Sequence, residues 1–347
     1  LKLLIKKKAK IVLVSHQGSF KKKNSLQLDF LKNFLKLKLK TKLVFLKNKK
    51  KAFYKKNLEL IKPGEILVLP NIRFFKGEEL NSKALAKKIS KLGNCIVLGG
   101  FSKAHRENSS NNAILNFLPG YMSNGIYNEL KLLQPWLNPE PGSMLILGGE
   151  KIEKINIGLK YLSKKYQFIL PTGIVLNTIL KLKGFNIGLS KYHKGKKEND
   201  VVKNFINDSN KKILIPKKII VFSKQKTKKK EYNELNKIKQ KHIIGGFFLT
   251  STMIKIIKNC LKKNKNIIIA GSPSLISKKC FEPTQELSTL IEKNNKKVLL
   301  LGGDTVSDLK FSGKKSSGGG SALYYLSKKS LPILKTLYKN QIKFNVV

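Results

Sequence analysis

Between residues 298 and 305 an apolar run, VLLL, is followed at once by two glycines, an aspartate and a threonine. The run is typical of a buried strand, and the break at Gly302 and Gly303 is expected to lead into a helix near Asp304 and Thr305. A turn of this kind presents backbone N–H groups and the positive end of a helix dipole, both of which bind phosphate oxygens. Asp304 is placed where its carboxylate could hold a metal ion on those phosphates.

A second glycine turn follows in the same stretch of the chain. Two serines precede Gly318, Gly319 and Gly320, and residues 322–326 after them are helix formers. Either turn alone is common in ordinary strand-to-helix connections. The repetition of strand, glycine turn and helix start predicts a phosphate-binding region built from both turns.

The only two arginines of the chain, Arg73 and Arg106, both lie in predicted loops after strands. The remaining 69 of the 71 basic residues are lysine. A guanidinium is planar, always charged and able to donate two parallel hydrogen bonds, which lysine cannot reproduce. We therefore expect both arginines to bind an anion, the alternative being a structural salt bridge.

Strand and helix patterns alternate along the chain, and they are expected to position these residues. Strands are predicted over residues 10–14, 42–45, 65–69, 95–98, 143–147, 213–216, 219–222 and 298–301, and helices over 26–37, 82–91 and 127–139. Alternation of this kind indicates an α/β fold with parallel sheets flanked by helices, and with ligands at the carboxyl ends of the strands. The lysine-rich run 224–241 is predicted to be a solvated surface insert.

The chain has 347 residues and a formal net charge of +51, with 41% hydrophobic residues. Its length suits two domains, each with a core of its own. The charge favours nucleic acid as a possible partner, but the lysines are spread along the whole length rather than gathered in one tail. Three cysteines without metal-ligand spacing indicate a reducing compartment. No apolar run reaches the roughly 18 residues of a membrane helix.

Several of these segments, in this order, resemble the phosphoglycerate kinases. The chain has S-H-Q-G-S-F where the family has S-H-L-G-R-P, P-N-I-R-F for E-N-V-R-F, and A-H-R in common with it. The resemblance implies a basic patch that holds 3-phosphoglycerate. Its members would be His16, Gln17, Gly18, Ser19, Arg73, His105 and Arg106.

The second half of the chain carries the nucleotide motifs of the same family. G-G-E-K resembles the family's G-G-A-K, which implies that Lys151, and Lys154 after a one-residue deletion, contact nucleotide phosphates. G-G-D-T implies phosphate contacts from Gly302, Gly303, Asp304 and Thr305, with Mg²⁺ on Asp304. S-S-G-G-G implies that Gly318, Gly319 and Gly320 lie where the phosphoryl group is transferred.

The resemblance implies two Rossmann-like domains joined by a hinge helix. Residues 1–135 would bind 3-phosphoglycerate, and residues 136–347 would bind ATP or ADP, with the last residues returning toward the first domain. The expected reaction is reversible transfer of a phosphoryl group between 1,3-bisphosphoglycerate and ADP, in a cytoplasmic monomer. A catalytically decayed kinase fold and a basic RNA-binding protein remain the alternatives.

The chain also departs from the family pattern. Ser19 stands where the family has an arginine, Gly99 and Gly100 replace an acidic and amide pair, and Ala270 and Ser277 replace nucleotide contacts. The family's first segment, which supplies a strand and an arginine at the transferring phosphoryl group, is expected to precede Leu1. An arginine of that kind contributes on the order of 10³ or more to a phosphoryl-transfer rate.

Overall fold

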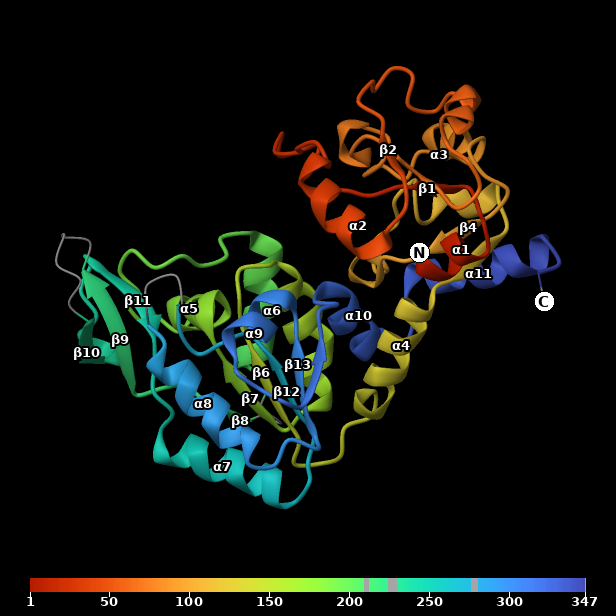
Figure 1. The fold of residues 1–347 in the computed structure, drawn as a ribbon. Helices are drawn as coiled ribbons and strands as arrows, with labels where there is room; N and C mark the ends of the chain where they lie inside the picture. Colours follow the sequence, from red (N-terminus) through yellow and green to blue (C-terminus); the bar gives the residue numbers. More distant parts are fainter. Residues whose placement is uncertain (209–211, 224–229, 276–279, 347) are drawn as a thin grey trace. The chain divides into compact units, whose positions relative to one another are not determined.

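The computed structural model describes residues 1–208, 212–223, 230–275 and 280–346 (Figure 1). The chain forms two compact units. Residues 1–100, 104–126 and 332–347 make unit 1, and residues 101–103 and 127–331 make unit 2. Ser277 and residues 224–229 of the predicted surface insert lie outside the described residues.

Unit 2 is built around a parallel sheet of six strands in the order β14-β13-β12-β6-β7-β8. The strands are β6 Met144–Leu147, β7 Phe168–Pro171, β8 Lys212–Ile213, β12 Ile267–Ala270, β13 Val298–Leu301 and β14 Lys314–Ser316. The three central strands, β6, β12 and β13, are buried at every position. Burial on both faces explains why their sequences are uninterrupted apolar runs.

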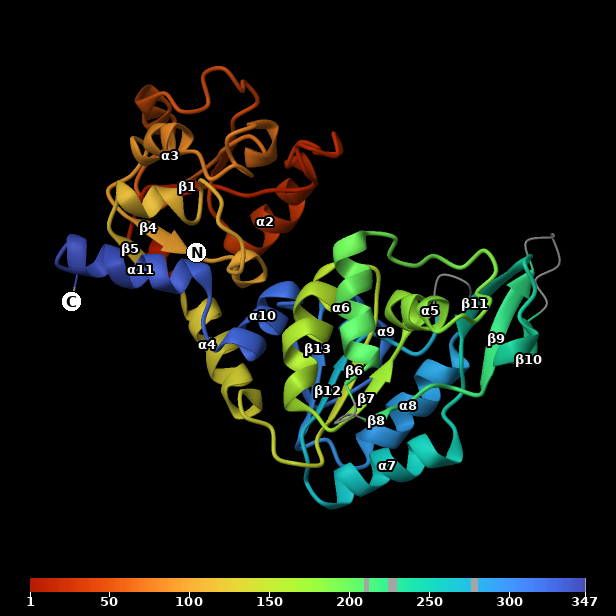
Figure 2. The same cartoon turned by 180° about the vertical axis from the view of Figure 1, so that it is seen from behind.

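Helices cover both faces of this sheet. On one face, α7 (Ser251–Lys262) and α8 (Glu282–Glu292) pack into the same apolar cluster as Ile267 and Leu300 (Figure 1). On the other, α6 (Lys196–Ile206) lies beside a π-helix over Lys154–Leu162 (Figure 2). The predicted α/β class, with parallel sheets flanked by helices, is confirmed.

A separate antiparallel sheet, in the order β10-β9-β11, corrects the prediction for residues 224–241. Its strands are β9 Lys218–Ser223, β10 Lys230–Glu234 and β11 His242–Gly246. Immediately after β10, Leu235 and Ile238 are buried in the core of unit 2. Because the segment is rich in lysine, it was expected to be only solvated, and the sequence did not indicate strand β10 or the buried residues Leu235 and Ile238.

Unit 1 contains two small parallel sheets. The first has the order β1-β3-β2, with β1 Ile11–Leu13, β2 Leu43–Phe45 and β3 Ile66–Val68, and the second pairs β4 Ile96–Leu98 with β5 Gly120–Met122. The helices are α1 Lys2–Lys6, α2 Lys32–Leu39, α3 Lys83–Ser90 and the C-terminal α11 Pro332–Lys343. The amide of Asn340 in α11 fixes the start of β5, because its Oδ1 accepts from Gly120 N–H at 2.8 Å and its Nδ2 donates to Leu118 O at 2.7 Å.

Three predicted elements have different bounds in the structure. The helix expected over 26–37 begins only at Lys32, after a 3-10 turn, because Leu26 N–H and O are bonded to the side chains of Gln17 and Asn71. The helix expected over 127–139 is α4, Asn124–Leu133, which gives way to a 3-10 turn at Pro135. The strand expected over 213–216 is β8, Lys212–Ile213, which begins one residue earlier and ends well before Pro216.

Candidate active site

Five neighbouring strands of unit 2, β14, β13, β12, β6 and β7, end at one edge of the sheet, and a glycine follows each of them directly or within two residues. Because the strands are parallel, their carboxyl ends lie together, where α/β proteins bind ligands. Hydrogen bonds connect the turns across this edge. Gly148 N–H donates to Ala270 O at 3.1 Å, and Gly302 N–H donates to Ser316 O at 2.8 Å.

The turns after β6, β7 and β12 approach one another so closely that side chains do not fit between them. A Cβ on Gly271 would lie 2.6 Å from the backbone of Gly148. One on Gly148 would lie 1.8 Å from Thr172 Oγ1 and 2.7 Å from the Thr172 carbonyl oxygen. Glycine is therefore required for contact between the three turns, independently of any ligand.

The turn after β13 confirms the helix start predicted near Asp304. Gly302 precedes α9, Gly303–Asp308, with a φ of +98° that other residues rarely adopt. Asp304 is exposed in the first turn of this helix, whereas Thr305 is buried. The carboxylate of Asp304 is thus available to a ligand at the edge of the sheet.

The turn after β14 is held by Ser316. Its hydroxyl donates to Glu129 Oε2 at 2.6 Å and accepts from Gly318 N–H at 3.1 Å. Gly318 is buried against the ring of Phe101. Helix α10, Gly320–Lys328, then begins directly at the third glycine of the turn, with Gly319 at a φ of +51°.

Lys154 is buried at the same edge and begins the π-helix of unit 2. Its Nζ donates to Ala270 O at 2.7 Å, so the side chain extends from the turn after β6 to the end of β12. Burial lowers the pKa of Lys154 to about 7, and the charge of Lys151 adds to the fall, while Asp304 and Glu153 oppose it. Lys151, by contrast, is exposed.

A second carboxylate near this edge, Asp308, was not identified from the sequence. Asp308 Oδ2 accepts a hydrogen bond from the Ser272 hydroxyl at 3.0 Å, which links α9 to the turn after β12. Burial raises the pKa of Asp308, and the negative charge of Asp304 one helical turn away adds to the rise, against the Ser272 hydrogen bond. No sequence motif indicated this residue, because its contact with Ser272 depends on the tertiary structure.

A cavity of about 260 Å³ opens between the turns after β6 and β7 and the antiparallel sheet. Its wall is largely apolar, and Asn177 contributes an amide whose Nδ2 donates to Lys191 O at 2.9 Å. The apolar lining includes Ile174, Leu176, Leu189, Ile243, Phe247 and Pro273. These residues come from four separate segments, so no local pattern in the sequence could have grouped them.

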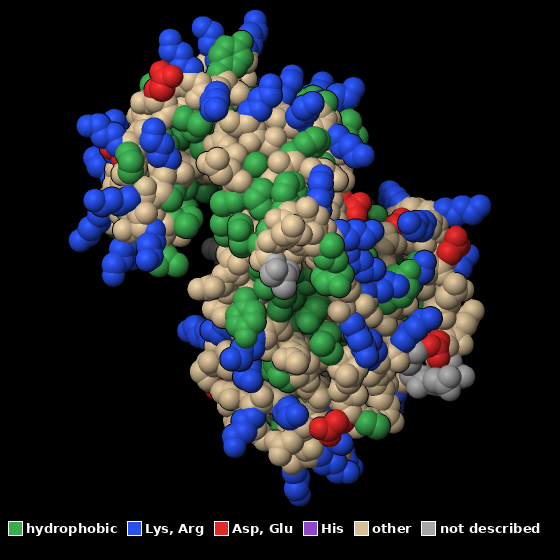
Figure 3. Space-filling model, turned by 90° about the vertical axis from the view of Figure 1, so that its right-hand side faces the viewer, with side chains coloured by type: hydrophobic (Ala, Val, Ile, Leu, Met, Phe, Trp, Pro, Cys, Tyr) green, Lys and Arg blue, Asp and Glu red, His purple; other side chains and the backbone are tan. Residues whose placement is uncertain are grey.

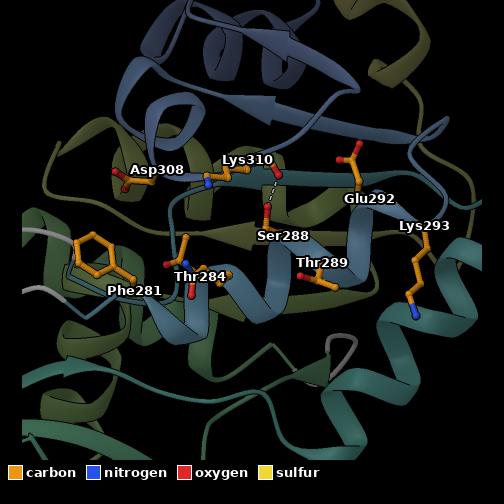
Figure 4. Close-up of a pocket in the computed structure, with 9 residues that line it drawn as sticks. Phe281, Thr284, Ser288, Thr289, Glu292, Lys293, Asp308 and Lys310 are labelled. Atoms are coloured by element: carbon orange, nitrogen blue, oxygen red, sulfur yellow. Dashed lines mark hydrogen bonds between the residues drawn. The ribbon is translucent and has the colours of Figure 1, made fainter.

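A larger, more open cavity of about 740 Å³ lies along α8. Thr284, Ser288 and Glu292 line it from one side of the helix, and Asp308 and Lys310 line it from the opposite segment (Figure 4). The Ser288 hydroxyl donates to the backbone oxygen of Lys310, which closes part of the floor. Two residues of this lining also contact the turn after β12: Asp308 through Ser272, and Thr284 through Ser274 at 2.6 Å.

In unit 1, the loop after β1 carries the predicted residues His16, Gln17, Gly18 and Ser19. Asn71 anchors it, because Asn71 Nδ2 donates to Gln17 O at 2.7 Å and Asn71 Oδ1 accepts from Gln17 N–H at 3.2 Å. The side chain of Gln17 is itself bonded to the backbone within the loop. The loop is therefore fixed by side-chain to backbone bonds rather than by regular secondary structure.

Arg73 is 2% exposed, in a 3-10 turn over Ile72–Phe74 directly after β3. Its guanidinium forms an ion pair with Glu79 and lies 3.5 Å from Asn108 Oδ1, while its Nε has no hydrogen-bond partner among the residues that the structure describes. The salt bridge, which the sequence left open as an alternative, is therefore present. Arg73 does not offer its guanidinium to solvent in this structure.

Arg106 differs from Arg73 in being exposed. Its Nε donates to His105 Nε2 at 3.3 Å, so these two predicted residues lie together. Two asparagines connect Arg106 to Arg73: Asn111 Nδ2 donates to Arg106 O at 3.1 Å, and Asn111 Oδ1 accepts from Asn108 N–H at 2.9 Å. The two arginines thus belong to one hydrogen-bonded region of unit 1.

Glycine turns at the carboxyl edge of a parallel sheet, with a lysine and a carboxylate beside them, define a nucleotide-binding α/β protein. The phosphoglycerate kinase family model matches residues 1–329, and the chain belongs to this family. The phosphoglycerate kinase of Wigglesworthia glossinidia brevipalpis is 33% identical over 359 residues, 97% of this chain and 86% of the relative. That of Finegoldia magna is 30% identical over 284 residues, 78% and 71% of the respective chains.

Solved structures agree on the fold. Phosphoglycerate kinase from Pyrococcus horikoshii superposes with a TM-score of 0.78 at 22% identity, covering 99% of this chain and 89% of the other. The enzyme from Coxiella burnetii gives 0.69 at 22%, covering 96% and 87%. The family is one of phosphotransferases, and its reaction is reversible phosphoryl transfer between 1,3-bisphosphoglycerate and ADP.

None of the helices in the described ranges is long and apolar enough to cross a membrane. In the same ranges, His, Cys, Asp and Glu side chains form no group of three or more that could hold a metal ion.

Proposed function

We propose that unit 2 binds ADP or ATP with Mg²⁺ at the carboxyl edge of its sheet, and that unit 1 binds 3-phosphoglycerate or 1,3-bisphosphoglycerate. The observation that carries this proposal is the meeting of the glycine turns beside buried Lys154 and exposed Asp304. Family membership gives the reaction, and the arrangement of turns at this edge supports assigning the nucleotide to it.

The nucleotide phosphates would lie on the turn after β13. Backbone N–H groups of Gly303 and Thr305 would donate to phosphate oxygens, with Lys151 and Lys154 supplying positive charge. The N–H of Gly302 is bonded to Ser316 O, so Gly302 would shape the turn rather than donate to the ligand. The base fits the apolar cavity of about 260 Å³ that opens from the neighbouring turns. An apolar cavity with few polar groups is typical of small-molecule sites in proteins.

Asp304 fits the requirements of a magnesium ion. Mg²⁺ is usually held by one or two carboxylates together with substrate phosphates and water, rather than by a complete cage of side chains. Asp304 is an exposed carboxylate at the turn proposed to hold the phosphates. The bound ion would neutralise phosphate charge during transfer.

The phosphoglycerate would be held by exposed Arg106, with His105 beside it and His16 on the loop after β1. Arg106 can donate two parallel hydrogen bonds to a carboxylate or phosphate. Gln17 and Gly18 complete the proposed contact region through the fixed loop, and the Ser19 hydroxyl is bonded to Glu79. Arg73 is buried and paired with Glu79, so it would support this region rather than contact the ligand itself.

Phosphoryl transfer depends on positioning and electrostatic stabilisation more than on covalent catalysis. Of the three predicted glycines, Gly319 and Gly320 would present backbone N–H groups at the start of α10 and stabilise the charge of the transferring group, while Gly318 holds the turn. The hydrogen bond between Gly318 N–H and Ser316 Oγ fixes this turn before substrate arrives. Preorganised donors of this kind avoid reorganisation during the reaction.

We assign phosphoglycerate binding to residues 1–135 and nucleotide binding to residues 136–347, and we propose that the protein is a cytoplasmic monomer.

The net charge of +51 is not assigned to RNA binding. On the face drawn in Figure 3, lysines are scattered over the surface rather than collected into one stripe. Nucleic-acid binding typically uses a basic patch concentrated on one face.

The test is turnover of the purified protein with 3-phosphoglycerate and Mg-ATP, measured by coupled oxidation of NADH. We expect turnover that depends on both substrates and on magnesium. A folded protein that binds either substrate but gives no turnover would favour a decayed kinase. Absence of binding to both substrates would contradict the proposed function.

A further inference from the structure

The carboxylate of Glu79 collects donors from two separate parts of unit 1. The Ser19 hydroxyl donates to it at 3.0 Å, Phe20 N–H at 3.0 Å and Lys21 N–H at 3.4 Å. The guanidinium of Arg73 forms an ion pair with the same carboxylate. Glu79 therefore joins the loop after β1 to the 3-10 turn after β3.

These contacts favour the ionised form of Glu79. Partial burial pushes the pKa of its carboxyl group upward, but the Ser19 hydrogen bond, the charge of Arg73 and the two N–H groups lower it by more. Charge-assisted hydrogen bonds are roughly twice as strong as neutral ones. At neutral pH the carboxylate is charged and holds all four donors.

Arg73 depends on this carboxylate as much as the loop does. The guanidinium is 2% exposed, and a buried charge that loses its partner is strongly destabilised. The guanidinium also donates to Asn108 Oδ1, at 3.5 Å. Held in this way, Arg73 orients the carboxylate of Glu79 and would act on a ligand only through Glu79 and the loop bonded to it.

We propose that Glu79 is a positioning residue of the phosphoglycerate site, whose carboxylate holds the segment 19–21 on Arg73 and so fixes the loop that carries His16. This inference rests on the proposed function, because it assigns that loop to the phosphoglycerate. Ser19 then acts through Glu79 and does not bind the substrate directly. The guanidinium of Arg73 is likewise a support for Glu79.

A contrary role for the same contacts is competition with the substrate. The Ser19 hydroxyl, two backbone N–H groups and a guanidinium would suit the carboxylate of 3-phosphoglycerate as well as that of Glu79. In that case removing the charge of Glu79 would free the site and raise affinity. Positioning predicts the opposite sign, so one measurement separates the two roles.

The experiment uses three variants: Glu79→Gln, Ser19→Ala and the double variant that carries both changes. Glu59→Gln is the control. Glu59 is exposed in the same unit, so its variant carries the same change of charge without the contacts. Calorimetry would measure 3-phosphoglycerate affinity, and steady-state kinetics would give KM for each substrate. Amide hydrogen exchange at Phe20 and Lys21 reports on the loop without any ligand.

We expect Glu79→Gln to weaken 3-phosphoglycerate binding about tenfold or more, since a hydrogen bond to a charged group contributes about 1.5–3 kcal/mol. KM for ATP should stay within about twofold, and both amides should exchange faster. Ser19→Ala should weaken binding in the wild-type background but have no additional effect in the Glu79→Gln background. Such non-additivity is the signature of residues that act as one unit.

Unchanged or tighter 3-phosphoglycerate binding in Glu79→Gln would overturn the proposal, as would additive effects in the double variant. Should Glu79→Gln fail to fold, Ser19→Ala decides by itself: unaltered exchange at Phe20 and Lys21 would contradict the role. A wild-type protein that does not bind 3-phosphoglycerate would instead count against the proposed function. Amide exchange would still show whether Glu79 holds the loop.

Discussion

Lys154 Nζ donates a hydrogen bond to the carbonyl oxygen of Ala270 at 2.7 Å, across the contact between β6 and β12. The bond keeps an amine at the edge of the sheet that we propose to bind phosphate. Burial, reinforced by the charge of Lys151, lowers the pKa of Lys154 to about 7. The amine is therefore largely neutral at pH 8 and would charge when an anion arrives.

Nucleotide binding at pH 8 should accordingly take up a proton. A bound phosphate favours the ammonium form, so it raises the pKa of Lys154 from about 7 toward that of an ordinary lysine. We expect about one proton to be taken up per nucleotide bound at pH 8. Fewer should be taken up at pH 6, where the amine of Lys154 is already protonated. Calorimetry in two buffers of different ionisation enthalpy measures this number.

Lys154→Met provides the comparison for proton uptake, because it retains an apolar stem and removes the titrating amine. The variant should bind nucleotide more weakly, with no uptake at pH 8. Equal uptake in the variant and the wild type would assign the proton to another group.

Removing the charge of Asp304 should abolish the magnesium-dependent part of nucleotide binding. At 100 times its dissociation constant, a ligand stabilises the folded protein by roughly 2.7 kcal/mol, which a thermal scan detects as a rise in Tm. Asp304→Asn keeps the shape of the side chain but loses the charge that a hard cation needs. The Tm shift produced by Mg-ADP in the variant should fall to that produced by ADP with a chelator.

Ser307→Asn, on an exposed position of the same helix, is the matched control for the metal site. Its magnesium-dependent shift should equal that of the wild type. A shift of equal size in Asp304→Asn would remove this residue from the proposed metal site.

Much of the parallel sheet was predictable, because its strands are encoded by local apolar runs. The strand Val298–Leu301 has the bounds expected from the sequence, and the glycine turn and helix start follow as predicted. The short edge strand β14, Lys314–Ser316, was not expected, since two of its three residues are exposed lysine. An edge strand of this kind is defined by hydrogen bonds to β13 rather than by apolar residues.

Arg73 illustrates what the sequence could not supply about the candidate site. Its rarity among lysines indicated a role that needs a guanidinium, which is consistent with the buried ion pair. The partner, Glu79, is only six residues away, but its contact with the loop at Ser19 spans 60 positions. Contacts of such separation arise from strand order, so a sequence pattern identifies the arginine without identifying what it holds.

Gly148→Ala should disturb the meeting of the turns after β6 and β7. The new Cβ would lie 2.7 Å from the Thr172 carbonyl oxygen, and backbone cannot move away as a flexible side chain can. Overpacking of this kind costs typically 1–3 kcal/mol of unfolding free energy. Denaturant unfolding should show this loss, together with weaker nucleotide binding. Gly99→Ala, with nothing within 4 Å of its Cβ, should leave stability within about 0.5 kcal/mol.

Arg106→Lys tests the proposed anion ligand of unit 1. A lysine keeps the charge but loses the fork geometry, and a charge-assisted hydrogen bond contributes about 1.5–3 kcal/mol. Affinity for 3-phosphoglycerate should therefore fall by roughly one to two orders of magnitude, while affinity for Mg-ADP should hardly change. Calorimetry with each ligand measures both quantities on the same preparation.

The reverse change, Lys87→Arg on an exposed position of α3, controls for a general effect of exchanging the two cations. If charge alone attracted the substrate, Arg106→Lys and Lys87→Arg would both be silent, because 69 of the 71 basic residues are already lysine. If Arg106 grips the anion with two parallel bonds, only its own replacement weakens binding. Undiminished 3-phosphoglycerate affinity in Arg106→Lys would exclude this residue as the ligand, and the basic region of unit 1 would then attract the substrate only by its field.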